Sequence, residues 1–250
     1  MPIDEKVKIL DHKKLAPSYF KLTLFSEYIT KNAQPGQFVQ VKVPGVFLRR
    51  PLSVHALNPA EKTFELLYEV IGPGTQALSR LKAGQELDIL GPLGTGFKLE
   101  GKKAVLMAGG MGIAPLCFLA KELLRKKQEV SVLIGAKSSA LVLCEEPLKQ
   151  LGAQVSVTTE DGSCGHKGLV TDLIPALNSR QSTIYACGPR AMLKAVAKLA
   201  KQKNIPCQVS LEAYLACGIG ACLGCAVETK DGYKMACKDG PVFNAEEIVW

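Results

Sequence analysis

The first hundred residues carry the hydrophobic pattern of β-strands. Apolar and polar side chains alternate over residues 19–26 and 37–43, and residues 64–71 and 86–90 are further strand candidates. Paired Gly and Pro residues separate these segments at positions 35–36, 44–45, 73–74 and 91–92, as is typical of turns. The pattern therefore predicts a small antiparallel barrel.

The pattern changes after Gly101, where apolar strands begin to alternate with helical stretches. The strand candidates are residues 103–108, 129–135, 155–159 and 183–187, and the helical stretches are residues 113–126, 169–177 and 190–203. This alternation predicts a doubly wound parallel sheet. From Cys207 the chain is rich in glycine and cysteine. We expect three units, a β-barrel (1–100), an α/β domain (101–206) and a small C-terminal module (207–250).

Composition narrows the function classes. The net charge is +8, but Lys and Arg are scattered and no long basic run carries interleaved aromatic residues, so we expect no nucleic-acid binding. The segment Met1–Lys8 is charged and lacks the apolar core of a secretory signal. No run of about 18 apolar residues exists, so we expect no membrane span. These features predict a cytoplasmic protein.

Four of the nine cysteines crowd near the C-terminus. Cys217, Cys222, Cys225 and Cys237 have the spacing C-x4-C-x2-C-x11-C, which is the plant-type ferredoxin arrangement for [2Fe–2S]. Small residues at Gly218, Gly220 and Gly224 let the backbone approach such a cluster. A structural zinc site is the alternative, although zinc usually takes paired C-x2–4-C knuckles, and plain buried cysteines are a third. The sequence predicts [2Fe–2S].

Four other cysteines lack partners at ligand spacing. They are Cys117, Cys144, Cys164 and Cys207. Free cysteine commonly behaves as a small apolar residue. We therefore interpret these four as packing residues.

A short arginine motif in the barrel half is a flavin-site candidate. It consists of Arg50, Pro51, Leu52 and Ser53 and follows a strand-like stretch. Arginine offers a cationic fork for a diphosphate, and Ser53 could bond a flavin edge. Further candidates are Leu67, Tyr68, Glu69, Gly74 and Thr75, of which Tyr68 could pack on the cofactor and the glycine turn could face a phosphate. An Arg-Pro turn and a core tyrosine are the plain alternatives.

Two glycine-containing turns follow strands of the predicted parallel sheet. One contains Gly109, Gly110 and Gly112, and the other is formed by Cys187, Gly188 and Pro189. Nucleotides bind at the carboxyl ends of such strands, near a helix N-terminus. The first turn departs from G-x-G-x-x-G, and the second could be a simple strand-to-helix turn. We expect both turns to bind a dinucleotide.

In this order, the segments resemble the ferredoxin–NADP reductase superfamily and, within it, the electron-transfer subunits of class B dihydroorotate dehydrogenase. The resemblance covers nearly the whole chain. Beyond the motifs above it is carried by Asp161–Ser163, Gly165–Gly168, Tyr185–Pro189 and Lys238–Phe243.

The resemblance implies a specific set of cofactors and a partner. It implies FAD contacts at residues 50–53, 67–69 and 74–75, cluster ligation by the four C-terminal cysteines, and NAD as the nucleotide. It also implies an FMN-containing catalytic subunit, two of each chain in the complex, and electron transfer to NAD⁺ in pyrimidine (UMP) biosynthesis. No catalytic acid or base is expected on this chain, and His55 is given no role.

Two other functions stay open on the sequence alone. One is a flavin and iron–sulfur reductase subunit that serves ferredoxin or a sulfur-reducing or hydrogenase complex. The small subunits of NADH-dependent ferredoxin–NADP oxidoreductases have an Asp in place of one cluster cysteine, whereas Cys217 stands at that position here. The other is a nonenzymatic adaptor stabilised by zinc.

Overall fold

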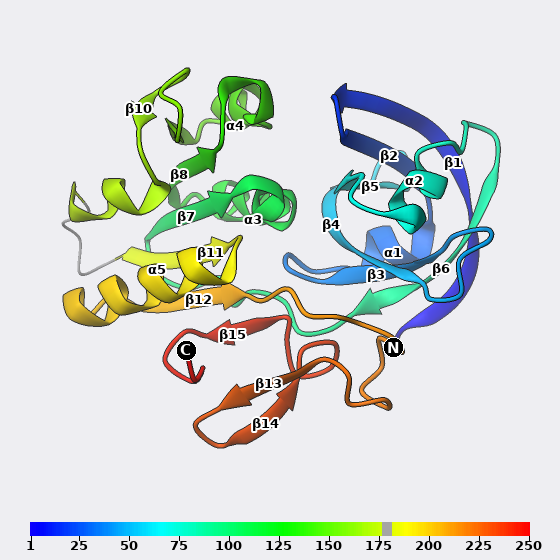
Figure 1. Cartoon of the computed structure of the whole chain (residues 1–250). Helices are drawn as coiled ribbons and strands as arrows, with labels where there is room; N and C mark the ends of the chain where they lie inside the picture. The colour runs from blue at the N-terminus through cyan, green and yellow to red at the C-terminus, as the bar shows by residue number, and fades with distance from the viewer. Residues whose placement is uncertain (177–181) are drawn as a thin grey trace.

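The computed structural model describes residues 1–176 and 182–250 and places a β-barrel beside an α/β sheet (Figure 1). The barrel is closed in the strand order β1-β2-β5-β4-β3-β6, and all its pairings are antiparallel. This confirms the predicted barrel. Its elements are β1 (Ile3–Ala16), β2 (Tyr19–Phe25), α1 (Glu27–Asn32), β3 (Phe38–Lys42), β4 (Arg50–Asn58), β5 (Thr63–Glu69), α2 (Pro73–Leu78) and β6 (Glu86–Leu93).

The hydrophobic pattern predicts neither β1 nor β4 as a strand, and β1 is the longer of the two. Strand β1 is rich in charged residues, and only Val7 and Ile9 are buried in it. It nevertheless pairs with both β2 and β6, and these two pairings close the barrel. Backbone hydrogen bonds therefore hold this strand where side-chain burial is small.

The second layer is a seven-stranded sheet in the order β10-β9-β8-β7-β11-β12-β15. Its first six strands run parallel and β15 runs antiparallel. The elements are β7 (Lys103–Gly109), η1 (Gly110–Gly112), α3 (Ile113–Arg125), β8 (Glu129–Ala136), η2 (Ser139–Leu141), α4 (Glu145–Gln150), β9 (Gln154–Thr159), β10 (His166–Lys167), η3 (Val170–Ala176), β11 (Ser182–Cys187), α5 (Arg190–Lys203), β12 (Cys207–Ser210), β13 (Ala226–Thr229), β14 (Gly232–Met235) and β15 (Val242–Asn244).

Helices cover both faces of this sheet. Leu106 on β7 joins the core that contains Leu116 and Leu119 of α3. The next side chain on the same strand, Met107, joins the core that contains Leu193 of α5. Successive strand residues point to opposite faces, so α3 and α5 lie on opposite sides. The doubly wound arrangement is confirmed.

One predicted helix differs in type. The stretch expected over residues 169–177 is the 3₁₀-helix η3, and its last expected residue lies outside the described residues. Within residues 1–176 and 182–250, no helix is both long and apolar enough to cross a membrane.

The C-terminal segment contacts both layers. Strands β12 and β15 complete the seven-stranded sheet, while β13 and β14 form a separate hairpin. Thr95, which follows the barrel, donates from its hydroxyl to the carbonyl of Lys238 at 3.2 Å. The loop of residues 211–225, which we call the cluster loop, connects β12 of the sheet to β13 of the hairpin, and its Gly218 lies against Gln40 of the barrel strand β3 (Figure 1).

Candidate functional site

The four C-terminal cysteines come together around backbone N–H groups. Ile219 and Cys222 donate to Cys217 Sγ at 3.5 and 3.4 Å, and Gly220 donates to Cys237 Sγ at 3.0 Å. Although desolvation opposes the change, the N–H groups of Ile219 and Cys222 lower the pKa of Cys217 to about 6. Donors aimed at sulfur stabilise thiolate ligands and tune a cluster's potential.

The spread of these sulfurs suits a cluster with two irons. Cys225 Sγ and Cys237 Sγ lie 3.3 Å apart, as expected for two ligands of one metal. Among the described residues, however, no three of the four cysteines place their sulfurs within 4.8 Å of one another. A mononuclear zinc site with bonds of about 2.3 Å requires that proximity. The donor set therefore fits [2Fe–2S] better than zinc.

A buried amide lies between the cluster loop and the barrel. Gln40 on β3 is fully buried, and neither atom of its amide has a hydrogen-bond partner among the described residues. Its Cγ and Nε2 lie 2.8 Å from the point where a Cβ on Gly218 would stand. Across the barrel sheet, Gln40 pairs with Pro51 of the arginine motif. A buried amide is normally hydrogen-bonded, so this position fits a polar cofactor atom.

The alternation over residues 37–43 places Gln40 on the face of β3 opposite Val39 and Val41. The cluster loop covers that face, so the side chain is buried. The only sequence signal was the glycine-rich loop, whose place of docking the sequence does not specify.

The arginine motif meets the glycine turn that was predicted to accompany it. Residues 50–53 come after β3 in the chain and themselves form the beginning of a further strand, β4. A Cβ on Gly74 would lie 2.8 Å from Arg50 Cδ and 3.0 Å from its Nε, so the arginine crosses directly over this turn. Arg50 donates to the carbonyl of Leu48 at 2.8 Å, and no described carboxylate pairs with it. A cation beside a glycine turn suits a diphosphate.

The other flavin candidates lie on β5 and in the first turn of α2. The Tyr68 hydroxyl lies 2.9 Å from Nε2 of His12, and the Tyr68 ring stacks on Phe20 at 5.7 Å. The Tyr68 side chain therefore packs inside the barrel. Thr75 uses its hydroxyl within its own turn, where it accepts from the backbone N–H of Ile71 at 3.0 Å.

Leu67 and Glu69 point away from that barrel core. Leu67 is buried toward the nucleotide domain, in the same apolar cluster as Leu106. Glu69 is half-buried, and Ser18 donates to its carboxylate at 3.5 Å. These two residues therefore line the side of β5 that faces the α/β sheet.

The two nucleotide motifs lie side by side, because β7 and β11 are neighbours in the sheet. A Cβ on Gly112 would lie 2.0 Å from the carbonyl oxygen of Cys187, and one on Gly188 would lie 2.9 Å from the backbone nitrogen of Gly109. Only glycine permits this contact. From β7 the chain continues on one side to β8, whereas β11 lies on the other side. Ligands of doubly wound sheets bind at such a switch point.

A buried thiol and an acidic residue occur at the same edge. Burial raises the pKa of Cys187 to about 12, so the thiol stays neutral at physiological pH. Glu212 follows β12, the strand next to β11, and contributes to that shift. The Glu212 side chain reaches solvent, but surrounding protein and the charge of Glu69 raise the pKa of its carboxyl. Glu212 was not among the predicted site residues, and its only signal in the sequence was its place directly after a strand.

Two of the four cysteines interpreted as packing residues lie in a polar group. Cys117 and Cys144 lie beside His55, the histidine that was given no role. All four cysteines, including Cys164 and Cys207, also contact the apolar cores, as predicted. The sequence could not predict that Cys117 and Cys144 meet a histidine, because the two cysteines are not at ligand spacing.

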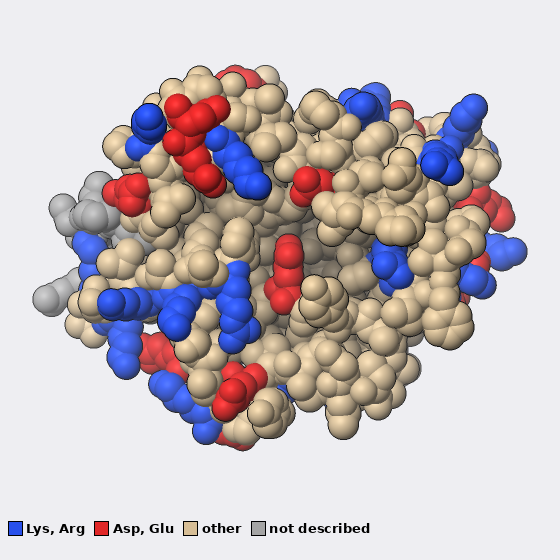
Figure 2. Space-filling model, in the orientation of Figure 1, with Lys and Arg blue, Asp and Glu red and all other residues tan. Residues whose placement is uncertain are grey.

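A hollow separates the barrel from the α/β sheet on the face shown in Figure 2, and acidic side chains lie in it. Lys and Arg gather over α5, whereas the surface over the cluster loop carries few charges. The cofactor candidates of both domains border the space between the two layers.

Comparison with known proteins identifies the same parts. A family model described as the iron–sulfur cluster binding domain of dihydroorotate dehydrogenase B matches residues 212–249, and a model of the oxidoreductase NAD-binding domain matches residues 106–198. These matches confirm the predicted iron–sulfur and nicotinamide cofactors. The reductase-like fold fits the predicted flavin.

Whole-length relatives agree with these matches. The dihydroorotate dehydrogenase B (NAD(+)) electron transfer subunit of Caldanaerobacter subterraneus subsp. tengcongensis is 42% identical over 98% of each chain. That of Desulforamulus reducens is 38% identical over 97% of each chain. A chain in a solved structure of an NADH-dependent reduced ferredoxin–NADP oxidoreductase is 33% identical, with a TM-score of 0.90, over 98% of this chain and 90% of the other. On this likeness in sequence and fold, the chain belongs to the family of dihydroorotate dehydrogenase B electron transfer subunits.

Proposed function

We propose that this chain carries electrons from the FMN of a dihydroorotate dehydrogenase catalytic subunit, through [2Fe–2S] and FAD, to NAD⁺ in pyrimidine (UMP) biosynthesis. The names of the full-length relatives support this function. The proposal includes two copies of each subunit and the boundaries 1–100, 101–206 and 207–250 for the three units. It also places the complex in the cytoplasm, since none of the nine cysteines forms a disulfide and disulfides are rare in a reducing compartment.

Different groups of residues would bind each of the three cofactors. Cys217, Cys222, Cys225 and Cys237 would hold the cluster, residues 50–53, 67–69 and 74–75 the FAD, and the two nucleotide turns the NAD. When bound, FAD exchanges either one or two electrons, which links hydride transfer at nicotinamide to single-electron transfer at iron–sulfur. The protein itself positions these groups and shields them from water.

The observation that carries the proposal is the position of the cluster loop. Its inner side packs on Gln40 of β3, and Gln40 pairs with Pro51 of the flavin motif. Its outer side exposes apolar residues, with Ile219 54% and Leu223 64% exposed. If these two side chains only packed the cluster module, they would be buried.

This arrangement suits a subunit that receives electrons from a partner. Tyr214 of the same loop is also 97% exposed, and few charges surround the loop in Figure 2. An interface core is typically apolar and depleted of charge. A catalytic subunit docked here would bring its cofactor near the cluster, with the flavin on the other side.

The test is assembly with an FMN-containing dihydroorotate dehydrogenase catalytic subunit produced together with this chain. Wild type should co-purify with the subunit and reduce NAD⁺ with dihydroorotate. Leu223→Lys should weaken assembly while iron, FAD and NADH-to-dye activity stay at wild-type levels. Burying a leucine side chain stabilises an interface by about 1.5–3 kcal/mol, so the loss is about tenfold or more in affinity.

Tyr233→Lys is the matched control. Tyr233 is 71% exposed on the same C-terminal module but lies on the β13–β14 hairpin, so its substitution should leave assembly intact. Normal assembly of a cluster-loaded Leu223→Lys variant would rule out docking through the loop. Failure of the wild-type chain to assemble would reject the partner.

The second candidate is a reductase subunit that serves ferredoxin. The 33% identity to the ferredoxin–NADP oxidoreductase chain favours it. The same purified protein decides between the two, because a ferredoxin reductase would reduce ferredoxin with NADH and would not couple dihydroorotate to NAD⁺. Cysteine at position 217 favours the dihydroorotate dehydrogenase function.

A further inference from the structure

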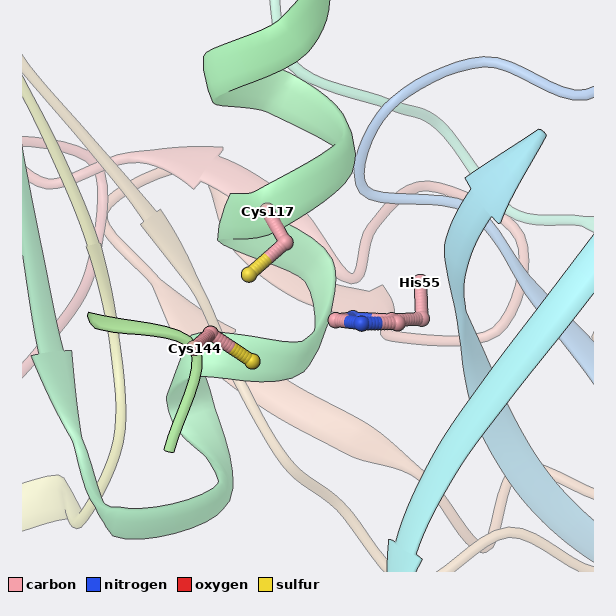
Figure 3. A group of neighbouring side chains, drawn as sticks. All are labelled: His55, Cys117 and Cys144. Atoms are coloured by element: carbon pink, nitrogen blue, oxygen red, sulfur yellow. The ribbon is translucent and has the colours of Figure 1, made fainter. Parts of the chain in front are cut away.

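Three metal-ligating side chains meet at the boundary between the barrel and the α/β sheet, away from the cluster loop. They are His55 on β4, Cys117 on α3 and Cys144 directly before α4 (Figure 3). Their ligand atoms all lie within 4.8 Å of one another. His55 is buried and the two cysteines are half-buried. Three separate elements thus point one nitrogen and two sulfurs at a common space.

The histidine is oriented as a metal ligand. Its Nδ1 lies 2.9 Å from the carbonyl oxygen of Ala114. A carbonyl only accepts hydrogen bonds, so Nδ1 carries the proton, and a metal-bound ring would present the lone pair of Nε2. A backbone carbonyl bound to the other ring nitrogen is the usual outer-shell partner of a zinc-bound histidine. The lone pair is then available to a metal between the ring and the two sulfurs.

Cys144 is held in an uncommon backbone conformation. Its φ of 65° is in the left-handed region, which residues other than glycine seldom adopt. Its side chain makes no capping hydrogen bond to α4, and Figure 3 shows the sulfur directed toward His55. The turn therefore directs the Cys144 thiol toward His55 and not toward the N-terminus of α4.

The dimensions and charge of the group suit one zinc ion. Bonds of about 2.3 Å to sulfur and 2.0–2.1 Å to nitrogen allow ligand atoms separated by less than 4.8 Å. Two thiolates and a neutral imidazole would balance the charge of Zn²⁺, which matters because an unbalanced charge is costly where water is scarce. No fourth His, Cys, Asp or Glu of the described residues joins the group, which leaves one position for water.

We propose that His55, Cys117 and Cys144 form a zinc site that clasps the flavin barrel to the nucleotide domain. His55 lies two residues beyond Ser53 of the flavin motif, on the same strand. Cys117 lies on the helix that follows the glycine turn of the nucleotide site. A metal bound here fixes the strand that carries the flavin motif against that helix, so the spacing between the flavin and nucleotide sites depends on it.

The test measures metals in the intact chain with its iron–sulfur cluster, purified without oxygen and supplied with one equivalent of Zn²⁺ before desalting. Elemental analysis should find about one zinc per chain besides the iron. X-ray absorption at the zinc edge should show two sulfurs at about 2.3 Å with nitrogen or oxygen at about 2.0–2.1 Å. This signal requires no variant, so a folding defect cannot hide it.

Variants then locate the ion. Cys144→Ser and His55→Gln should lose zinc while their iron content is unchanged, and the matched control Cys164→Ser should keep both metals. A wild-type chain that retains no zinc would overturn the proposal. A shell of four sulfurs would overturn it too, because the zinc would then occupy the cluster cysteines. Retention of zinc by Cys144→Ser would exclude that residue as a ligand and with it the site.

Discussion

Gly218→Ala is the most direct probe of how the cluster loop sits on the barrel. Gly218 has a φ of 76°, and an added Cβ would stand 2.8 Å from both Cγ and Nε2 of Gln40. Gln40 is fully buried and cannot swing into solvent. The substitution therefore combines backbone strain with a clash, and a matched residue can separate the two effects. Gly45 has nearly the same φ, 74°, and open space around its Cβ position.

The expected magnitudes follow from these two contributions. Left-handed backbone costs a residue with a Cβ about 1–2 kcal/mol, and this cost is shared by Gly218→Ala and Gly45→Ala. Overpacking a tight site adds about 1–3 kcal/mol, and only Gly218→Ala incurs it. Because 1.4 kcal/mol corresponds to a factor of ten, the clash should favour opening of the loop by about 5- to 150-fold.

The assay is the rate at which an iron chelator removes iron from the cluster-loaded protein. Gly218→Ala should lose iron about 5- to 150-fold faster than Gly45→Ala, which should stay close to wild type because its turn lies outside the cluster loop. The double variant Gln40→Ala/Gly218→Ala should regain most of the difference, since shortening Gln40 removes the atoms that clash. Equal rates for the two single variants, or no rescue in the double variant, would refute the packing of Gln40 on the loop.

Three further outcomes are expected. Cys222→Ser should lose iron and labile sulfide while FAD and NADH-to-dye activity remain, and full iron retention would contradict its role as a ligand. Arg50→Ala should weaken FAD binding about 10- to 100-fold in a flavin titration, because a charge-assisted hydrogen bond contributes about 1.5–3 kcal/mol, whereas Arg49→Ala, whose guanidinium pairs with Asp4 at 2.8 Å, should not. The folded pKa of Glu212 lies above the ordinary 4.5, so its contribution to stability is lost as pH rises through that pKa. The melting temperature of Glu212→Gln should therefore exceed that of wild type at pH 8, and the difference should narrow toward pH 4.5. A difference in melting temperature that does not change with pH would contradict this.

The sequence alone determined the features that depend on neighbours along the chain. The cluster cysteines are separated by 4, 2 and 11 residues, and a loop of that length with glycines limits which metal centre it can surround. Side-chain periodicity likewise predicted both layers of the fold, because a strand and a helix repeat with different periods. Periodicity did not predict the long strand β1, because few of its side chains are buried.

Only the tertiary structure decided the contacts between distant segments. The sequence pattern places Gln40 on the polar face of its strand, yet Gly218, about 178 positions later in the sequence, covers it. His55 meets Cys117 and Cys144 because β4 packs on α3 at the boundary of the two layers. Strand order and the packing of the two layers determine these contacts, and the spacing of residues along the chain does not predict them.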